Sequence, residues 1–420
     1  MKGPSRSGEG LRQATAILAL VTSLLLLPGC QLVYLCRVAA GQLELINGAI
    51  PVEDALQSAS LSETFKDRLS LAEKVKRFGE TNLGLKKTDS YSTVNLDPHS
   101  GKAYTVSASY KDRLVPVTWW FPVVGRLPYI GFFDLESARS EQRKLIEMDL
   151  DTMIGRVEAY STLGWFNDPL TLNLIEKSPV DLAETLLHEM THATLYVKGQ
   201  GEFNEGLATL VGKRGAYLFM RETFGPSHQL TREARESIED EGVFSSSFLR
   251  PLLAQLNQLY ASSLSYQEKL EEREKVFARS LDHFKSLSSR FQTSRFGRFG
   301  QGPLNNAILV SLAVYHGHYA LFEQALQQSG DSIPALLRKL RAMSEEEGNM
   351  VGLLQEWLGK RDTPMTSTLS APPYQETRMS PKSEYRNPKP YLLFRTGLRL
   401  PGVRPEHWRI RVWEEKRSSL

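Results

Sequence analysis

Two histidines four residues apart, with a glutamate directly after the first, are the residues of this sequence best suited to chemistry. They are His188, Glu189 and His192, in the segment HEMTH. On a helix, residues four apart lie one turn above each other, so the two imidazoles can bind one metal ion. Glu189 then lies beside the open coordination position and not on the metal. The pattern predicts a catalytic zinc site for hydrolysis; the alternative is two solvated histidines on a surface helix.

A catalytic zinc ion needs a third protein ligand besides a water molecule. After the loop KGQG the sequence turns helical again, and Glu205 near the start of that helix can point back at the two histidines. Glu202 is the nearest competitor, but we place it in the connecting loop. Some zinc peptidases continue the motif with a glycine three residues and a third histidine six residues after the second histidine. That longer motif is excluded here, because Leu195 and Lys198 occupy those positions. We therefore expect Glu205 to be the third ligand.

The helix that carries the two histidines has a clear start. Ser178 stands at an N-cap position, Pro179 at the first helical position, and Asp181 completes a pattern like a capping box. Four apolar residues follow at helical spacing, and no glycine or proline interrupts them before Gly199: they are Leu182, Leu186, Leu187 and Met190.

Composition excludes several classes of protein. The chain has 420 residues, of which 41% are hydrophobic and 24% charged, and its net charge is +3. These values are ordinary for a globular protein with a sizeable core, and no basic block indicates nucleic acid binding. The two cysteines, Cys30 and Cys36, are too few for a disulfide framework or a cysteine-ligated metal, so histidines and carboxylates must bind any metal.

The first thirty residues have the pattern of an export signal. A basic start is followed by an apolar stretch that is short for a membrane span and ends at Leu27-Pro28-Gly29-Cys30. This ending resembles the cleavage site of bacterial lipoproteins. The resemblance implies acyl chains on Cys30 and a protein anchored to the membrane without spanning it. Gln31 is consistent with transfer to the outer membrane, facing the periplasm. An uncleaved anchor or a plain secretory peptide is the alternative.

The mature chain reads as mostly helical with a small sheet. We expect helices at 32–46 and 52–78, an antiparallel meander between 90 and 124, and a helix at Leu135–Gly155. The segment 159–175 approaches the metal helix as strand and loop, and we expect a substrate-pairing edge strand there.

The second half of the chain is dominated by helical spacing. Residues 230–290 are predicted to form a long helical hairpin, and LNNAILVSLAVYHGHYALFEQAL is predicted to be one apolar helix. From about residue 360 proline, serine and basic residues replace the periodic pattern. The predicted parts are a signal peptide at 1–29, a helical segment at 30–89, a metallopeptidase core at 90–225, a helical domain at 226–358 and a tail at 359–420.

The chain resembles the bacterial predicted-aminopeptidase lipoproteins, a zincin-like family. The similarity runs from YLCRVAAGQLELI through WFPVVGRLPYIGFF, AYSTLGWFNDP, LLHEMTHATLYVKG and FNEGLATLVG to LNNAILVSLAVY. It implies an α+β, mainly helical fold with a zincin-like catalytic core. It also implies that His188, His192 and Glu205 bind Zn²⁺ and that Glu189 is the catalytic carboxylate. Thr209, one turn after Glu205, stands where many zinc peptidases have an aspartate that orients a histidine.

The expected reaction is peptide hydrolysis, in which Glu189 moves a proton from water to the leaving amine. The donor for the oxyanion is sought among Tyr160, Tyr315, His316 and His318, of which Tyr315 is preferred because it lies in the family-like stretch. Asp168 and Glu202 are candidates for binding the α-ammonium group of the substrate.

The exopeptidase assignment rests on the resemblance alone. A zinc endopeptidase is the near alternative, and a non-catalytic lipoprotein scaffold is the alternative from another class. The expected partners are a peptide substrate and, through Cys30, a membrane of the bacterial envelope, with no nucleic acid; the sequence does not indicate an oligomeric state.

Overall fold

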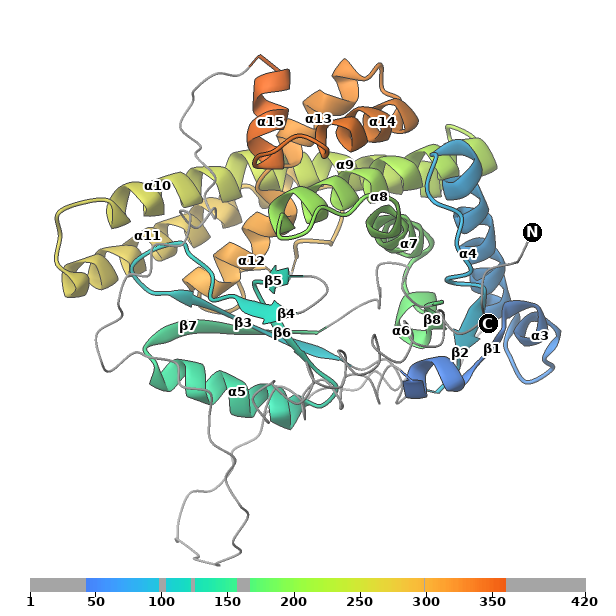
Figure 1. Cartoon of the computed structure of the whole chain (residues 1–420), viewed down its shortest axis with the longest axis horizontal. Coiled ribbons are helices and arrows are strands. Elements are labelled where there is room, and N and C mark those ends of the chain that lie inside the picture. Colours follow the sequence, from blue (N-terminus) through green and yellow to red (C-terminus); the bar gives the residue numbers. More distant parts are fainter. Residues whose placement is uncertain (1–42, 98–102, 122–124, 157–166, 298, 360–420) are drawn as a thin grey trace, which may run out of the picture. The chain divides into compact units, whose positions relative to one another are not determined.

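The computed structural model describes residues 43–97, 103–121, 125–156, 167–297 and 299–359 (Figure 1). All of these residues belong to one structural unit. Cys30, Cys36, His99, Tyr160 and the tail after residue 359 lie outside the described residues, as do the export signal and residues 159–166 of the predicted substrate-pairing segment.

The two helices of the predicted metal site are α7 (Pro179–Thr194) and α8 (Gly201–Phe224). The remaining helices of the N-terminal half, and the two that follow α8, are α3 (Val52–Gln57), α4 (Glu63–Asn82), α5 (Leu135–Glu147), α6 (Leu172–Ile175), α9 (Gln229–Val243) and α10 (Arg250–Tyr260). A π-helical turn at Phe244–Leu249 joins α9 to α10. The C-terminal helices are α11 (Tyr266–Ser286), α12 (Asn306–His316), α13 (Tyr319–Gln328), α14 (Ile333–Met343) and α15 (Met350–Trp357), with a 3-10 turn at Ser288–Arg290.

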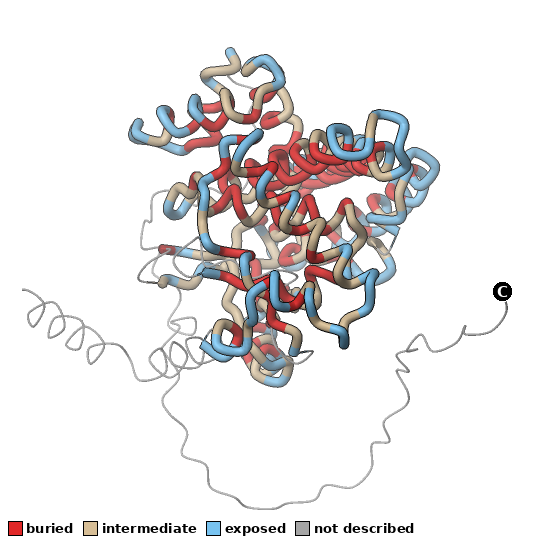
Figure 2. The backbone as a smooth tube through the Cα atoms, turned by 90° about the vertical axis from the view of Figure 1, so that its right-hand side faces the viewer, coloured by how far each residue is buried: buried red, intermediate tan, exposed pale blue. Residues whose placement is uncertain are grey.

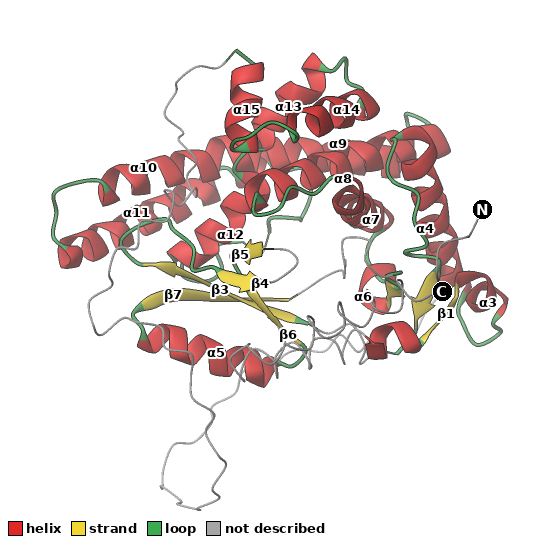
Figure 3. Ribbon diagram, in the orientation of Figure 1, coloured by secondary structure: helices red, strands yellow, loops and turns green. Residues whose placement is uncertain are grey.

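The described strands form three small sheets, whereas the sequence predicts one meander (Figure 3). In the first sheet β2 (Thr93–Asn95) pairs antiparallel with β1 (Ala49–Pro51) and parallel with β8 (Leu170–Thr171). In the second, β3 (Tyr104–Tyr110) pairs antiparallel with β6 (Ile130–Phe132) and β7 (Leu150–Arg156). The third is the hairpin of β4 (Trp119–Phe121) and β5 (Gly125–Leu127). The prediction of a meander is wrong because β2 and β3 take their partners from distant parts of the chain.

Three predicted helices are divided in the structure. The helix predicted at 52–78 is interrupted after Gln57 and restarts at Glu63, where the Ser62 side chain accepts a hydrogen bond from the Phe65 amide. The helix predicted at Leu135–Gly155 ends at Glu147, and the rest of that range is strand β7. Asp149, with a φ of 61°, turns the chain between the two.

The third divided helix is the apolar one after residue 303. It becomes α12 and α13, because the chain turns at Gly317 and His318. In contrast, the predicted helical hairpin is confirmed, since α10 and α11 pack against each other.

Apolar side chains gather in three clusters. The largest joins α3, α4, α6 to α9 and α13 to α15, and a second joins the π-helical turn with α10, α11 and α12. The third lies between β3, β7 and α5. Helix α12 packs against β3 and β7, as does α5, and in Figure 3 these two helices lie on opposite faces of the sheet. Buried positions, red in Figure 2, concentrate along the inner helices.

The architecture is therefore α+β and mainly helical, as predicted. Within the described part of the chain, no helix combines the length and the apolar character that crossing a membrane requires.

Candidate metal centre

Helix α7 begins where the sequence predicts. The Ser178 hydroxyl accepts a hydrogen bond from the Asp181 amide at 3.1 Å and donates to the Asp181 carboxylate at 2.8 Å. This differs from a full capping box, in which the acidic side chain would accept from the backbone of the cap residue. The capped helix brings His188 and His192 one above the other, with ring centroids 4.8 Å apart.

Helix α8 is placed against α7 by glycine and by one asparagine. A Cβ atom on Gly212 would lie 2.6 Å from the Glu184 carbonyl oxygen and 3.3 Å from the His188 Cβ atom, so only glycine permits this approach. In the first turn of α8, the Asn204 side chain accepts from the amide of Val197 in the connecting loop and donates to the Val197 carbonyl oxygen, both at 2.8 Å. Asn204 is buried, and these two bonds fix the direction in which α8 leaves the loop.

The three predicted ligands come together. The Glu205 Oε2 atom lies 3.1 Å from His188 Nε2 and 3.3 Å from His192 Nε2, and the two Nε2 atoms are 3.2 Å apart. A tetrahedral Zn²⁺ ion bound at about 2.0 to 2.1 Å by nitrogen and oxygen would hold its ligand atoms about 3.3 Å from one another. The donor set therefore fits a small divalent cation in both chemistry and spacing.

The charges at this site favour a cation. Burial lowers the pKa of His192, but the charge and hydrogen bond of Glu205 outweigh it and raise that pKa to about 9. Burial raises the pKa of Glu205, but the two histidines outweigh it and hold that pKa below its usual range. Without a metal, a proton on His192 balances the buried carboxylate. A metal ion would take the place of that proton.

Glu189 is half buried on the same helix. Its charge contributes to the raised pKa of His192, so the carboxylate lies on the side of the metal ligands. The role of Glu189 in proton transfer stays a prediction.

Two tyrosines lie beside the histidines. The ring of Tyr315 stacks on His188, with centroids 6.2 Å apart and 24° between the planes. The ring of Tyr196 stands edge-on to His192, with centroids 6.3 Å apart. Burial and the charge of Glu205 raise the pKa of Tyr196, so its hydroxyl keeps its proton. Sequence reasoning missed Tyr196, although it stands four residues after His192, because α7 ends before it and no helical spacing applies.

The other described candidates contact residues other than the three ligands. His316 is paired with Glu241, at 2.6 Å, and His318 with Glu202, at 3.2 Å. Asp168 is buried, and its backbone bonds to Tyr91 and Ser90. Glu202 lies in the first turn of α8 and not in the loop where the sequence reading places it.

A buried ion-pair network joins α7 and α8 to α9. Lys213 on α8 lies 3.4 Å from Glu184 on α7 and 3.4 Å from Glu241 on α9, and it donates to the Ser237 hydroxyl at 3.0 Å. Arg295 pairs with Glu184 at 3.2 Å. Because each buried charge has a partner of opposite sign, the network links three helices without leaving an isolated charge.

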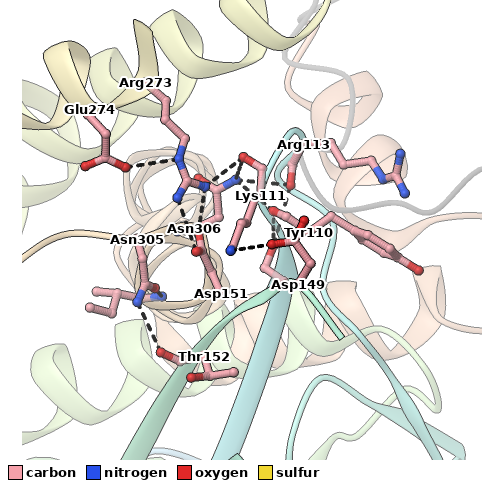
Figure 4. A network of polar contacts seen from close by, with 12 residues as sticks. Tyr110, Lys111, Arg113, Asp149, Asp151, Thr152, Arg273, Glu274, Asn305 and Asn306 are labelled. Carbon is pink, nitrogen blue, oxygen red and sulfur yellow. Dashed lines mark hydrogen bonds and ion pairs between the residues drawn. The ribbon is translucent and has the colours of Figure 1, made fainter. Parts of the chain in front are cut away.

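Helix α12, which carries Tyr315, is attached to the second sheet by a polar network at its start (Figure 4). The Asp151 carboxylate on β7 accepts from the Asn306 amide at 2.9 Å and from Arg273 Nη1 at 2.8 Å. The Asn306 side chain donates to the Tyr110 carbonyl oxygen, and the Asn305 side chain donates to that of Thr152. These contacts explain the paired asparagines of the sequence: both orient the helix that places Tyr315.

Comparison with known proteins gives the class. The family model described as Putative aminopeptidase matches residues 33–350, which is most of the chain. The chain belongs to that family. No curated protein and no solved structure matches it. The family description indicates peptide hydrolysis. Among the described residues, the donor set of α7 and α8 could bind a metal ion.

Proposed function

We propose that this protein is a zinc-dependent peptidase that removes residues from the N-terminus of peptides. The observation that carries the proposal is the convergence of His188, His192 and Glu205, with ligand atoms 3.1 to 3.3 Å apart, beside Glu189. The family description supports the substrate class. In this reading the two packed helices form a zincin-like core.

The metal would be held by His188 Nε2, His192 Nε2 and Glu205 Oε2. When bound, Zn²⁺ supplies Lewis acidity, which lowers the pKa of a coordinated water from 15.7 towards about 7 and polarises a carbonyl group. Glu205 balances the charge of the cation and is fixed by the loop bonds of Asn204.

Glu189 performs the proton transfers. Its carboxylate accepts a proton from the attacking water and donates it to the nitrogen of the leaving amine. Tyr315 or Tyr196 donates a hydrogen bond to the oxyanion that forms at the scissile carbonyl. Tyr315 is favoured by its stacking on His188, and Tyr196 by the raised pKa that keeps its hydroxyl protonated.

We also propose that the protein works in the bacterial envelope, anchored by acyl chains on Cys30. The support is the sequence pattern at residues 1–30. Replacing Cys30 by serine should move the protein out of the membrane fraction, and a variant that stays membrane-bound would contradict the anchor.

The experiment for the activity compares the metal-loaded protein, the chelated protein and the Glu189→Gln variant on a set of free peptides. We expect chelation to abolish turnover and Glu189→Gln to lower kcat by roughly 10² to 10⁴ while the bound metal stays. Glu239→Gln, at a surface pair on α9, is the matched control and should equal the wild type. Full turnover by the chelated protein or by Glu189→Gln would exclude this mechanism.

A further inference from the structure

A cavity of about 130 Å³ opens beside the first turn of α8. Its walls come from three distant parts of the chain, represented by Arg126 of β5, Glu202 of α8 and Val314 of α12. Val314 is adjacent to Tyr315, and Glu202 is one turn from Glu205 on the same helix. The cavity is therefore lined by residues that neighbour the candidate metal centre along α8 and α12, and its volume suits one amino-acid residue and not a length of peptide.

The carboxylate in the cavity wall is only partly satisfied. Glu202 Oε2 accepts a hydrogen bond from His318 Nε2 at 3.2 Å, and the side chain is 13% exposed. Glu202 Oε1 is buried, and among the described residues no donor reaches it. A carboxylate oxygen without a donor is costly away from bulk water, so this group is suited to a ligand that brings hydrogen-bond donors and positive charge. An ammonium group brings three donors.

The three-residue offset of Glu202 and Glu205 on α8 is compatible with the geometry of an N-terminal residue. The α-nitrogen of a peptide lies about 2.5 Å from the carbonyl carbon of the same residue. A carboxylate bound to that nitrogen at about 2.9 Å thus lies within about 5 to 6 Å of the scissile carbonyl. Side chains three positions apart on a helix have Cβ atoms about 5 to 6 Å apart. Asp168, the other acidic candidate, is not part of the cavity wall.

We propose that Glu202, held in place by His318, binds the α-ammonium group of the substrate and that the cavity receives the substrate's N-terminal residue. This inference rests on the proposed function and supplies the group that makes the peptidase specific for free N-termini. Arg126, which also lines the cavity, would suit a carboxylate instead, so the experiment must distinguish the two ends of a peptide.

The test measures kcat/KM of the metal-loaded full-length protein for a leucine-initiated peptide and for its N-acetylated twin. We expect the wild type to prefer the free amine, and Glu202→Gln to lower kcat/KM for the free peptide by roughly 10- to 100-fold with little effect on the acetylated one. Glu222→Gln, an exposed position on the same helix, is the matched control and should behave as the wild type. If the role of Glu202 were purely structural, Glu202→Gln would lower kcat/KM equally for the free and the acetylated peptide.

Three results would overturn the proposal while leaving peptide hydrolysis intact. The first is an equal kcat/KM of the wild type for the free and the N-acetylated peptide. The second is an unchanged preference of Glu202→Gln for the free peptide, and the third is an equal loss of kcat/KM for both peptides in that variant. A preference for a free C-terminal carboxylate that disappears in Arg126→Gln would assign the cavity to the C-terminal end of the peptide. That result would also overturn the proposal and leave peptide hydrolysis intact.

If the wild type cleaves neither peptide, the proposed function fails, but the subsite is still tested by calorimetry. The metal-loaded protein should bind L-leucinamide more tightly than N-acetyl-L-leucinamide, and Glu202→Gln should lose that difference. Equal binding of the two amides by the wild type, or an undiminished difference in the variant, would overturn the subsite.

Discussion

Replacing Gly212 by alanine tests whether the close approach of α7 and α8 creates the metal centre. The new Cβ atom would lie 2.6 Å from the Glu184 carbonyl oxygen, one turn before His188. Opening this contact to an ordinary 3.4 Å requires a shift of about 0.8 Å between two backbones. Metal ligands tolerate displacements of only about 0.2 Å, and functional side chains in general about 0.5 Å.

The effect on stability and the effect on metal binding should therefore separate. Alanine gains about 1 kcal/mol of helix propensity over glycine, whereas overpacking costs about 1 to 3 kcal/mol, so unfolding free energy should fall by no more than about 2 kcal/mol. Affinity for Zn²⁺ should fall at least tenfold, because His188 moves away from Glu205. We would measure affinity by competition with a chromophoric chelator and stability by urea denaturation.

Gly242 on α9 is the matched control, since a Cβ atom there has no neighbour within 4 Å. Gly242→Ala should leave metal affinity unchanged and stabilise the protein by up to about 1 kcal/mol. If Gly212→Ala binds zinc as tightly as the wild type, the glycine contact does not determine the ligand geometry, and this reasoning is refuted.

Three further predictions follow from the same contacts. Tyr315→Phe should lower kcat by roughly 10² with KM unchanged if its hydroxyl binds the oxyanion, and Tyr196→Phe should then have a small effect; steady-state kinetics that show the reverse order would reassign the donor to Tyr196. Zinc removal should lower the melting temperature, because the ion binds only the folded state. Calorimetry with and without chelator measures this, and an unchanged melting temperature would contradict it. Burial raises the pKa of Glu241, but the charges of His316 and Lys213 outweigh it and lower that pKa to about 2. The stabilisation by Glu241, on the order of 3 kcal/mol, is complete above pH 4.5 and is lost as the pH falls towards 2, so urea denaturation at pH 7 and pH 3.5 should differ less for Glu241→Gln than for the wild type.

The helix of the metal site was predictable because its signals are local. The side-chain bonds of the Ser178 cap, the proline at the first helical position and the apolar spacing all lie within one segment. The sequence favours Glu205 over Glu202 by placing Glu202 in the connecting loop, and that placement is wrong because α8 already begins at Gly201. The structure nevertheless brings the Glu205 carboxylate to the two histidines. The role of Asn204 was not predictable, because its two bonds to Val197 depend on the shape of a loop.

The strands were the hardest elements to predict, and the end of α5 shows why. The segment Leu145–Leu150 continues the apolar spacing of a helix, yet Asp149 adopts a positive φ and the chain enters β7. What decides this is the pairing of β7 with β3, whose residues are some forty positions earlier, together with the Asp151 contacts to Arg273 and Asn306. No local pattern contains that information, because each partner is in a different part of the sequence.

The same distinction separates the metal centre from the parts that give it specificity. A metal motif is carried by residues within one or two turns of helix, so a sequence can display it. The cavity lined by Glu202 is assembled from β5, α8 and α12, and the hydrogen bond to the Glu202 carboxylate comes from His318, more than one hundred positions later. Reaction chemistry is thus encoded locally in this chain, whereas recognition of the peptide end depends on how distant elements pack. A variant that alters packing without replacing a ligand, such as Gly212→Ala, therefore tests how far metal binding itself also depends on packing.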